Sequence, residues 1–423
     1  MTYYQSTSPA VTYPELTATL HCDVCIIGAG YAGLACAAGM IERGNSDVVM
    51  IEAEQVGFGA SGRNGGFVFG GFSLGNQSLL MQLGSVRARN LYQLTLDAVE
   101  LIRTRIRRYD IECEINQSGV LLANWIDDPG LLTRTQQFMH SHFGVEWQLW
   151  SKERTREQLH TERYSGALHE KNAFHFHPLK YAQGLAAALT ARGMRLFEGT
   201  RAIRIDSSGA EKIVHTAHGQ IRARRVVVCC GGYLDTLVPQ LSRSVLPITT
   251  FAMATEPLGA RLQQAMSTTA AIYDTRFAFD YYRPMADTRL LWGGRISIFR
   301  PAPEQIATLL YRDMLKVYPQ LEGVRVEHAW SGQMSYARHQ MPQIGQLSAG
   351  SAIGIWYAMG FGGHGISTTT LAGEVVAEAI MNSRKLPAGL ENFGLPSVFG
   401  RPGLLAAQCT YWYYELRDWW KET

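Results

Sequence analysis

Hydrophobic and polar positions near the start of the chain predict a strand, a helix and a second strand. Residues 24–27 form a short apolar run, and an alanine-rich stretch with helical spacing follows it. Residues 48–51 form a second apolar run, which ends at the acidic Glu52. Short apolar runs of this kind are typical of buried parallel strands, so the region is predicted to form a β-α-β unit.

The turn between the first strand and the helix carries a G-x-G-x-x-G motif. Gly28 permits the tight turn, Gly30 lets a pyrophosphate approach the backbone, and Gly33 lets the helix pack closely on the strand. Glu52 lies about twenty residues further on, where an acid can hold a ribose hydroxyl. We therefore predict a dinucleotide site, which the motif alone would allow for either NAD or FAD.

Two later segments repeat the pattern of an apolar strand followed by glycines. Residues 225–230 lead into Gly232, and residues 353–359 lead into a glycine-rich loop and then a helix with one apolar face. Strands of one parallel sheet open onto a ligand crevice at their carboxyl ends. The three segments are therefore expected to build one nucleotide domain.

This gives a prediction for the domains. We expect a discontinuous Rossmann-like α/β domain from residues 20–76, 175–240 and 340–395. Residues 77–174 and 241–339 contain helical periodicity and stretches typical of antiparallel strands, and they are expected to form an inserted α+β substrate domain. The length of 423 residues agrees with more than one domain.

Composition narrows the class of protein further. Hydrophobic residues make up 46% of the chain and charged residues 18%, which suits a large interior. The formal net charge of +3 is small and the basic residues are scattered, which argues against nucleic-acid binding. The polar N-terminus does not resemble a signal peptide, and no apolar run is long enough to span a membrane.

Cysteine and histidine spacings indicate neither a redox motif nor a metal site. The seven cysteines lack a disulfide-framework spacing, which favours a reduced, cytoplasmic protein. Cys22 and Cys25 form C-x-x-C, but they lie on a predicted buried strand and are expected in the core. His175 and His177 would share a strand face, yet Pro178 follows at once and no third ligand is evident, so no metal is predicted.

Arginine and aromatic residues around positions 280–295 suggest where a substrate binds. Tyr282 and Arg283 lie on one predicted strand, within residues 273–283, and Arg295 ends a neighbouring one. A guanidinium can hold a carboxylate while aromatic rings enclose the rest of the substrate. We predict that Arg283 binds a carboxylate, with Tyr282 and Trp330 as walls; the alternative is a sheet with ordinary aromatic pairs and exposed arginines.

The two ends of the chain differ in character. Residues 1–20 are expected to be an extended polar leader, whereas residues 396–423 are predicted to form an aromatic amphipathic helix. Its apolar stripe is expected to dock on the protein itself, on a second subunit, or on a membrane surface. Mixed charges on this helix weaken the membrane alternative. The stripe comprises Leu405, Cys409, Trp412, Leu416 and Trp419.

Together these segments resemble the FAD-dependent D-amino-acid oxidase and sarcosine oxidase family over about residues 20–395. Residues 59–66, which read Gly-Ala-Ser-Gly-Arg-Asn-Gly-Gly, are similar to the subgroup that contains γ-glutamylputrescine oxidase and bacterial L-pipecolate oxidase. Residues 282–284, 293–295 and 411–418 are also similar to that subgroup.

The resemblance implies FAD contacts. The ADP half is assigned to Gly28, Gly30, Ala32, Gly33, Glu52 and Ala53. The pyrophosphate and the approach to the flavin ring are assigned to Ser61, Arg63, Asn64, Gly65, Gly66 and Gly232. The flavin's pyrimidine edge is assigned to Gly360, Gly362, Gly363, His364, Gly365, Ser367 and Thr368. His364 is also expected to form a hydrogen bond near the flavin.

The resemblance also implies the chemistry. It predicts oxidation of the C–N bond of an amine or amino acid to an imine by hydride transfer to the flavin, with O2 or a quinone as acceptor. FAD is expected to be non-covalent, because the late glycine region lacks the cysteine that anchors it in monomeric sarcosine oxidases, and residues 61–66 lack histidine. The alternatives are a non-catalytic flavoprotein subunit and an enzyme that oxidises another C–H donor.

Overall fold

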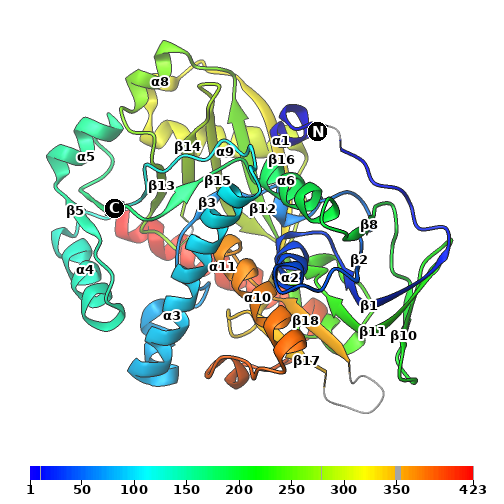
Figure 1. Cartoon of the computed structure of the whole chain (residues 1–423). Coiled ribbons are helices and arrows are strands. Elements are labelled where there is room, and N and C mark those ends of the chain that lie inside the picture. Colours follow the sequence, from blue (N-terminus) through cyan, green and yellow to red (C-terminus); the bar gives the residue numbers. More distant parts are fainter. Residues whose placement is uncertain (10, 278, 348–353, 423) are drawn as a thin grey trace.

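The computed structural model describes residues 1–9, 11–277, 279–347 and 354–422. Two eight-stranded sheets form the framework of the protein, with helices packed around them. Figure 1 shows the first sheet, with β1, β2, β11 and β18, below the second, which contains β12 to β16. The predicted mixed α/β architecture is confirmed.

The first sheet unites the three strand segments that the sequence predicted to lie together. Its parallel strands are, in spatial order, β18 (Ile355–Met359), β11 (Gln220–Val228), β1 (Thr19–Ile27), β2 (Val48–Ile51) and β8 (Arg195–Phe197). The antiparallel strands are β17 (Gln343–Gln346) beside β18, β10 (Lys212–His215) beside β11, and β9 (Arg204–Asp206) beside β10. The loops after β1, β11 and β18 consequently open at one edge.

Both faces of the first sheet are buried, which explains its continuous apolar runs. On β1, Val24 and Ile26 pack into one hydrophobic cluster, and Cys25 and Ile27 pack into another. Successive side chains on a strand point to opposite faces, so both sets of positions must be apolar. Cys25 is therefore a core residue, as predicted, and all seven cysteines are free.

Helices α2 (Tyr31–Glu42) and α10 (Ile366–Asn382) pack closely against each other beside this sheet. A Cβ at Gly373 would lie 2.5 Å from the backbone nitrogen of Cys36, so the contact requires glycine. Helix α3 (Asn76–Arg108) bends at Gly84 and also packs on α10. The predicted boundary at residue 77 stays a prediction, because α3 shares the hydrophobic core of the first sheet.

The second sheet is antiparallel except at one pair of strands. Its order is β16 (Val326–Ala337), β12 (Val245–Thr255), β15 (Leu290–Ser297), β14 (Tyr281–Pro284), β13 (Ala271–Asp274), β4 (Val120–Ala123), β6 (Ala167–Glu170) and β5 (Gln148–Trp150). Helix α9 (Pro303–Val317) packs on β16, β12 and β15. The expected single strand over 273–283 is wrong, because the chain loops out between β13 and β14, where Arg276 pairs with Asp274 and Asp280.

Shorter elements complete the fold. The remaining helices are α4 (Pro129–Phe143), α5 (Lys152–Leu159), α6 (Pro178–Thr190), α7 (Pro239–Ser242) and α8 (Ala260–Ala265). The two-stranded sheet consists of β3 (Phe67–Val68) and β7 (Phe174–His175). The 3-10 turns are η1 (Ala60–Gly62), η2 (Gly231–Tyr233), η3 (Pro319–Leu321) and η5 (Leu390–Asn392).

The N-terminal segment is not the extended leader that its polarity predicted. Residues Tyr3–Thr7 form helix α1, capped by Thr2, and the side chains of Tyr3 and Tyr4 are buried. Tyr4 packs edge-on against Trp330 and His177. Two adjacent tyrosines among polar residues supplied enough apolar area to bury this helix against the second sheet and α6.

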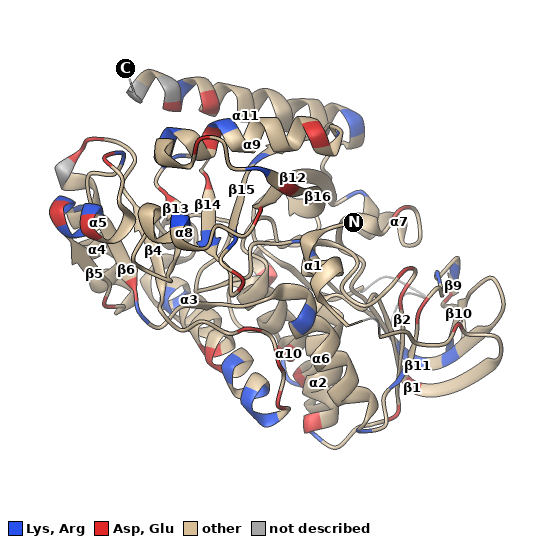
Figure 2. Cartoon of the chain, turned by 90° about the horizontal axis from the view of Figure 1, so that it is seen from above, with Lys and Arg blue, Asp and Glu red and all other residues tan. Residues whose placement is uncertain are grey.

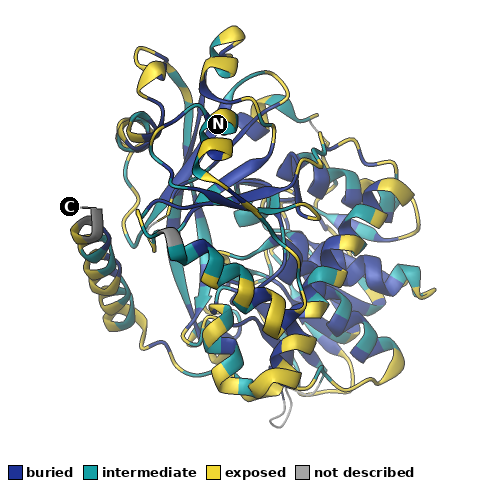
Figure 3. Ribbon diagram, turned by 90° about the vertical axis from the view of Figure 1, so that its left-hand side faces the viewer, coloured by how far each residue is buried: buried dark blue, intermediate teal, exposed yellow. Residues whose placement is uncertain are grey.

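Helix α11 (Gly400–Glu422) lies along the outer edge of the second sheet, away from α2 and α10 (Figure 2). It docks through polar and aromatic side chains. Gln408 accepts a hydrogen bond from the N–H of Ile298 at 3.0 Å, Glu415 pairs with Arg295, and Tyr414 stacks on Phe277 with ring centroids 4.1 Å apart. The outer face is exposed (Figure 3). The exposed large apolar residues on the helix are Leu405, Trp412, Tyr413, Leu416 and Trp420. Within the described residues, no helix is long and apolar enough to cross a membrane.

Candidate functional site

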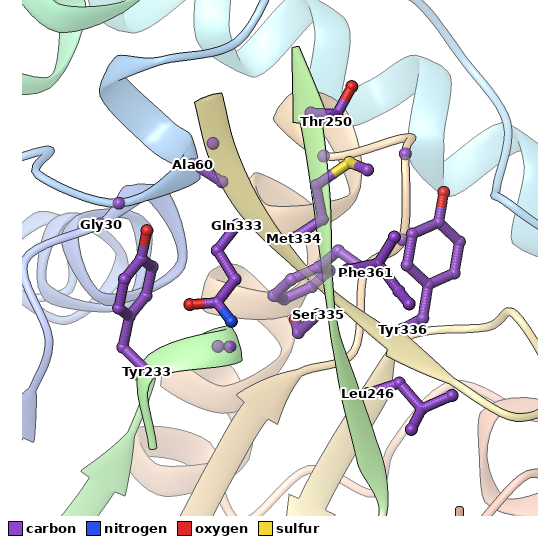
Figure 4. Close-up of a pocket in the computed structure, with 18 of the residues that line it drawn as sticks. Gly30, Ala60, Tyr233, Leu246, Thr250, Gln333, Met334, Ser335, Tyr336 and Phe361 are labelled. Atoms are coloured by element: carbon purple, nitrogen blue, oxygen red, sulfur yellow. The ribbon is translucent and has the colours of Figure 1, made fainter. Parts of the chain in front are cut away.

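A cavity of about 1310 Å³ lies between the carboxyl edge of the first sheet and the second sheet. All three predicted glycine loops contribute residues to its lining. Figure 4 shows Gly30 and Tyr233 at one end, Tyr336 and Phe361 at the other, and Gln333 between them. The cavity is elongated, as a dinucleotide with a substrate beside it requires.

The first glycine motif leaves the N-terminus of α2 open to this cavity. Gly28 has a φ of 106°, and a Cβ there would lie 2.9 Å from the carbonyl oxygen of Cys229. Gly30 caps the helix without a side-chain hydrogen bond. Gly33 faces away from the cavity, where a Cβ would lie 2.1 Å from the carbonyl oxygen of Gly28. Gly28 and Gly30 thus shape an anion site, and Gly33 permits the helix–strand contact.

Glu52 lies beside this helix terminus and lines the cavity with Ala32 and Ala53. Its carboxylate accepts hydrogen bonds from the N–H groups of Ala29 at 2.8 Å and Glu54 at 3.1 Å. Burial raises the pKa of Glu52. Each carboxylate oxygen can accept a further hydrogen bond, so a ribose hydroxyl could bind there. The residues present therefore fit the ADP half of a dinucleotide.

The second glycine loop runs along the middle of the cavity. The side chain of Asn64 fixes the conformation of this loop. Its Nδ2 donates to the carbonyl oxygens of Ala60 and Ser61, at 3.0 and 2.9 Å, and its Oδ1 accepts a hydrogen bond from the N–H of Gly66 at 2.7 Å. The Oγ of Ser61 accepts from the N–H of Tyr31 on α2 at 2.9 Å. Ser61, Arg63, Asn64 and Gly65 line the cavity.

Two further loops, which follow β11 and β18 of the first sheet, line the cavity opposite the second glycine loop. Gly232 follows β11 and lines the cavity. After β18, α10 begins without a side-chain cap at Gly365, so its positive end is available to a bound group. Gly360 has a φ of 74° and stands behind the lining. The residues of this last loop and the start of α10 that line the cavity include Phe361, Gly362, Gly363, His364, Gly365, Ile366 and Ser367.

His364 is half-buried and lines the cavity. Burial lowers the pKa of its imidazole to about 4, so the ring is neutral near neutral pH. Thr368 donates to the carbonyl oxygen of His364, which fixes the backbone at the start of α10. Ser367 donates to the carbonyl oxygen of Phe69 at 2.7 Å and so ties this loop to the strand region opposite.

Six rings form a continuous series along the cavity wall, here named the aromatic arc. The arc crosses from the late glycine loop to β13, β14 and β3. Successive ring centroids lie 5.0, 5.5, 6.0, 6.4 and 5.6 Å apart in the order His364, Phe69, Tyr273, Phe279, Tyr281 and Phe67. All six line the cavity. Faces of aromatic rings attract cations, so the arc can hold an ammonium group.

Three residues predicted to contact substrate do not line the cavity. Tyr282 is buried on the opposite face of β14, where it stacks on Trp292 with centroids 4.2 Å apart. Arg283 lies on the cavity side of β14, but Gly65 stands in front of it and accepts from its Nε at 2.7 Å. Trp330 is buried, with its Nε1 donating to the carbonyl oxygen of Arg63.

The alternation of side chains along β14 could have identified Tyr281 as the tyrosine that faces the cavity. Successive side chains on β14 point to opposite faces, so Tyr281 and not Tyr282 shares a face with Arg283. The sequence carried no signal that Gly65 would cover Arg283. Phe67, Phe69, Tyr273 and Phe279 were also missed, because the chain brings them together only through the contact between the two sheets.

The arginines that line the cavity are Arg63, Arg201, Arg276, Arg295 and Arg338. Carboxylates bind Arg201, Arg276 and Arg295, whereas Arg63 donates to the carbonyl oxygens of Phe58 and Ser331, and Arg338 lies over the ring of Phe399. Arg276 donates to Asp274 at 2.6 Å and to Asp280 at 2.7 Å. Arg295 pairs with Asp313 at 2.9 Å and with Glu415. Their guanidinium groups are therefore already engaged, and neither is a ready partner for a substrate carboxylate.

His175 ends β7, and His177 caps α6 two residues later. Within residues 1–9, 11–277, 279–347 and 354–422, no cluster of three metal-ligating side chains occurs. His175 Nε2 bonds to the carbonyl oxygen of Thr269, and His177 Nδ1 accepts from the N–H of Lys180. Each imidazole thus has its own structural partner.

The sequence matches a known family over most of its length. The family model DAO, described as FAD dependent oxidoreductase, matches residues 23–379. The chain is 33% identical over 427 residues to the probable oxidoreductase OrdL of Haemophilus influenzae, covering 98% of this chain and 96% of that protein. It is 34% identical over 382 residues to the γ-glutamylputrescine oxidoreductase of Escherichia coli, covering 89% and 88%.

Solved structures share the fold. Glycine oxidase from Geobacillus kaustophilus superposes with a TM-score of 0.75 at 21% identity, covering 89% of this chain and 99% of that one. L-proline dehydrogenase from P. horikoshii superposes with a TM-score of 0.73 at 18% identity, covering 93% and 99%. Likeness at these identities concerns the fold, and the chemistry must be argued from the cavity itself.

Proposed function

Because the chain belongs to the DAO family of FAD-dependent oxidoreductases, we propose that it oxidises the C–N bond of an amine to an imine. Bound FAD supplies the acceptor for the hydride. The protein supplies orientation and a cavity shielded from water. The observation that carries the proposal is the aromatic arc, which can bind an amine without a carboxylate clamp.

We propose a place on this chain's loops for each part of FAD. We place the adenosine half beside Glu52, the phosphates at the open end of α2, and the flavin ring between Gly65 and the start of α10. The open end of α10 favours negative charge, which suits the reduced flavin. We further propose that FAD is non-covalent. Acid precipitation should then leave all yellow colour in the supernatant, and flavin in the pellet would contradict it.

The aromatic arc favours an amine whose reacting end carries no carboxylate. A cationic amine gains from the ring faces, whereas an α-carboxylate beside the arc would need a cation there. Arg276, which follows Tyr273 of the arc by three residues, is already paired with carboxylates, and so is Arg295. His364 is neutral near neutral pH, so it does not repel an ammonium and can accept a hydrogen bond from it. The similarity to γ-glutamylputrescine oxidoreductase supports this substrate class.

The test is anaerobic bleaching of the flavin by a panel of substrates. We expect kcat/KM for γ-glutamylputrescine to exceed the values for glycine, L-pipecolate and L-proline. Equal or higher values for these α-amino acids would contradict the proposal. If none of these compounds bleaches the flavin while another C–H donor does, the alternative chemistry holds; no bleaching by any donor would favour a non-catalytic subunit.

Tyr273 provides a matched pair of variants for the arc. Tyr273→Leu removes a ring that stacks on Phe69 with centroids 5.5 Å apart, and Tyr273→Phe keeps it. We expect KM for the amine to rise about 5- to 30-fold in the leucine variant, the value of one desolvated cation–π contact. The phenylalanine variant should stay near the parent. Equal KM values in both variants would remove the arc from substrate binding.

The electron acceptor and the outer face of α11 complete the proposal. A peroxide assay against a quinone-analogue dye separates an oxidase from a dehydrogenase.

We propose that the exposed stripe on α11 contacts a second copy of the chain, because the helix carries both acidic and basic residues (Figure 2) and does not resemble a basic membrane-surface helix. We also propose a cytoplasmic location, in agreement with the unpaired cysteines. Light scattering and vesicle sedimentation of Trp412→Glu would separate dimer from membrane contact.

A further inference from the structure

Four consecutive carbonyl groups of the second glycine loop, residues 63–66, accept hydrogen bonds from four separate segments of the chain. Trp330 Nε1 donates to the carbonyl of residue 63 at 3.0 Å, and Tyr4 Oη donates to that of residue 64 at 2.9 Å. Arg283 Nε donates to the carbonyl of residue 65 at 2.7 Å, and the N–H of Phe176 donates to that of residue 66 at 3.0 Å. We name this set the carbonyl clamp.

The clamp fixes the direction of the N–H groups in the loop. In a trans peptide the N–H points opposite to the preceding carbonyl. With the carbonyls of Arg63 and Asn64 turned toward Trp330 and Tyr4, the N–H groups of Asn64 and Gly65 point the other way, toward the cavity that both residues line. Neither N–H has a hydrogen-bond partner within the described residues. They are therefore free to donate to a bound group.

Arg283 adds an uncompensated charge behind the loop. Its guanidinium is 3% exposed, and in the described part of the chain no carboxylate forms an ion pair with it. Its contacts are the carbonyl oxygens of Gly65 and Phe176, the hydroxyl of Tyr4 and the imidazole of His175. The positive charge of Arg283 influences His175, whose pKa falls to about 3 through burial and this neighbour. A buried cation without a counter-ion stabilises negative charge nearby.

We propose that Arg283, Tyr4 and Trp330 are positioning residues for FAD. They act through the backbone of the loop and present the N–H groups of Asn64 and Gly65 to the flavin ring. Arg283 in addition raises the flavin's reduction potential by its charge. This assignment replaces the carboxylate-binding role expected for Arg283 and gives a function to the N-terminal helix. It depends on FAD binding alone and holds whichever donor the enzyme oxidises.

Two adjacent tyrosines on α1 allow a matched test of the clamp. Tyr4→Phe removes the hydroxyl that holds the loop, whereas Tyr3→Phe removes one that donates only to Asp287. We expect the Kd for FAD, measured by fluorescence titration of the apoprotein, to rise about three- to tenfold for Tyr4→Phe, the effect of one hydrogen bond. Tyr3→Phe should match the parent. Equal Kd values in Tyr4→Phe and Tyr3→Phe would overturn the clamp.

Arg283 is tested separately by its charge. In Arg283→Gln the midpoint potential of bound flavin should become more negative, while Arg283→Lys, which retains the charge, should stay near the parent potential even if its Kd for FAD rises. A purely structural role would shift thermal stability in both variants and leave both potentials unchanged. That result would overturn the electrostatic part of the proposal. If Arg283→Gln binds no FAD, His175→Glu decides: a carboxylate beside Arg283 would compensate its charge and should also make the potential more negative, and an unchanged potential would overturn the electrostatic part.

Discussion

At the scale of single residues, burial decides the protonation of several histidines around the cavity. His177 is 1% exposed and caps α6, where its Nδ1 accepts from the N–H of Lys180 at 3.2 Å. Its Nε2 lies 3.0 Å from the hydroxyl oxygen of Thr7 and therefore carries the proton. Burial, helped by the nearby Lys180 and Arg283, lowers the pKa of His177 to about 3.

This depressed pKa makes acid destabilisation of the fold a testable consequence. The unfolded chain gains a proton at His177 below about pH 6.5, whereas the folded chain does not until about pH 3. The contribution of His177 to the free energy of unfolding is therefore complete above pH 6.5, and it is lost as the pH drops from about 6.5 to about 3. We expect His177 to account for about 1 kcal/mol of the loss between pH 7 and 5.5.

The variant His177→Asn keeps a good helix cap and removes the titrating group. Urea unfolding at pH 7 and 5.5 should show that the free energy of unfolding falls by about 1 kcal/mol less in this variant than in the parent. Thr7→Val is the control, since it removes the hydroxyl contact but keeps the imidazole, and its acid loss should equal that of the parent. An unchanged acid loss in His177→Asn would contradict the argument.

What the sequence could predict at this scale depended on whether local geometry decided the role. Gly28 and Gly30 were predictable because a tight turn and an open helix terminus follow from the motif alone. Arg283 was not, because its partners Gly65, Phe176 and Tyr4 come from three distant segments. Residue type indicated a charged group near the site, and only tertiary packing determined which side of the loop it occupies.

At the scale of elements, three helices are joined by one buried ionic cluster. Arg105 on α3 donates to Glu42 on α2 at 2.8 Å and also contacts Glu374 on α10. Its side chain is 1% exposed. A buried cation placed between two carboxylates contributes little net energy as a set, but removing one member leaves uncompensated charge.

We expect Arg105→Met to lower the free energy of unfolding by up to about 3 kcal/mol, because Glu42 and Glu374 lose their shared buried partner and keep only the more exposed Arg108 and Arg43. The triple variant with Glu42→Gln and Glu374→Gln should recover most of this loss. Urea denaturation with circular dichroism measures both. A triple variant as unstable as the single one would show that packing of the long side chain, and not its charge, holds the helices together.

Helix α11 shows how far an amphipathic pattern can be interpreted. The apolar stripe with 3–4 spacing correctly predicted a helix, but the structure docks the other side. Gln408 and Glu415 bind backbone and side-chain partners on β15 and in the loop that follows it, while Trp412 and Leu416 are exposed. Polar groups that satisfy one another across an interface can outweigh apolar area in choosing the buried face.

Removal of α11 tests its place beside the cavity. Residues 406–408, 410 and 411 line the cavity on the side of β15, so deletion of residues 400–423 should open it to water. We expect KM for the amine to rise at least about tenfold, as lost enclosure predicts, while the Kd for FAD changes less than about twofold. Ala407→Trp, which fills the same space, should raise KM and preserve the fold. A deletion that releases FAD would place α11 at the cofactor.

At the scale of the whole molecule, the cavity proposed for the cofactor lies where two sheets meet. The loops after β1, β2 and β11 come from the first sheet, and Thr250, Tyr281 and Gly294 come from the second. The presence of three separated strand segments in the first sheet followed from local patterns. The meeting of the two sheets did not, because it depends on contacts between distant segments, such as the one between Gly65 and Arg283, which are 218 residues apart.

This arrangement makes the two halves of FAD unequal as stabilising ligands. The ADP half is assigned to the first sheet alone, whereas the flavin half is expected to contact Gly65 and the second sheet. At a hundred times its Kd, FAD should raise the free energy of unfolding by about 2.7 kcal/mol, or Tm by about 3 °C for a chain of this length.

ADP at the same multiple of its own Kd should give a similar Tm shift but should protect from hydrogen exchange only strands β1, β2 and β11. FAD should in addition protect β14 and the segment around Gly65, because ligand that touches both sheets suppresses the opening of one against the other. Hydrogen-exchange mass spectrometry of the apoprotein with each ligand measures this difference. If ADP protected β14 as strongly as FAD does, the two sheets would already open as one unit, and the flavin ring would not be what joins them.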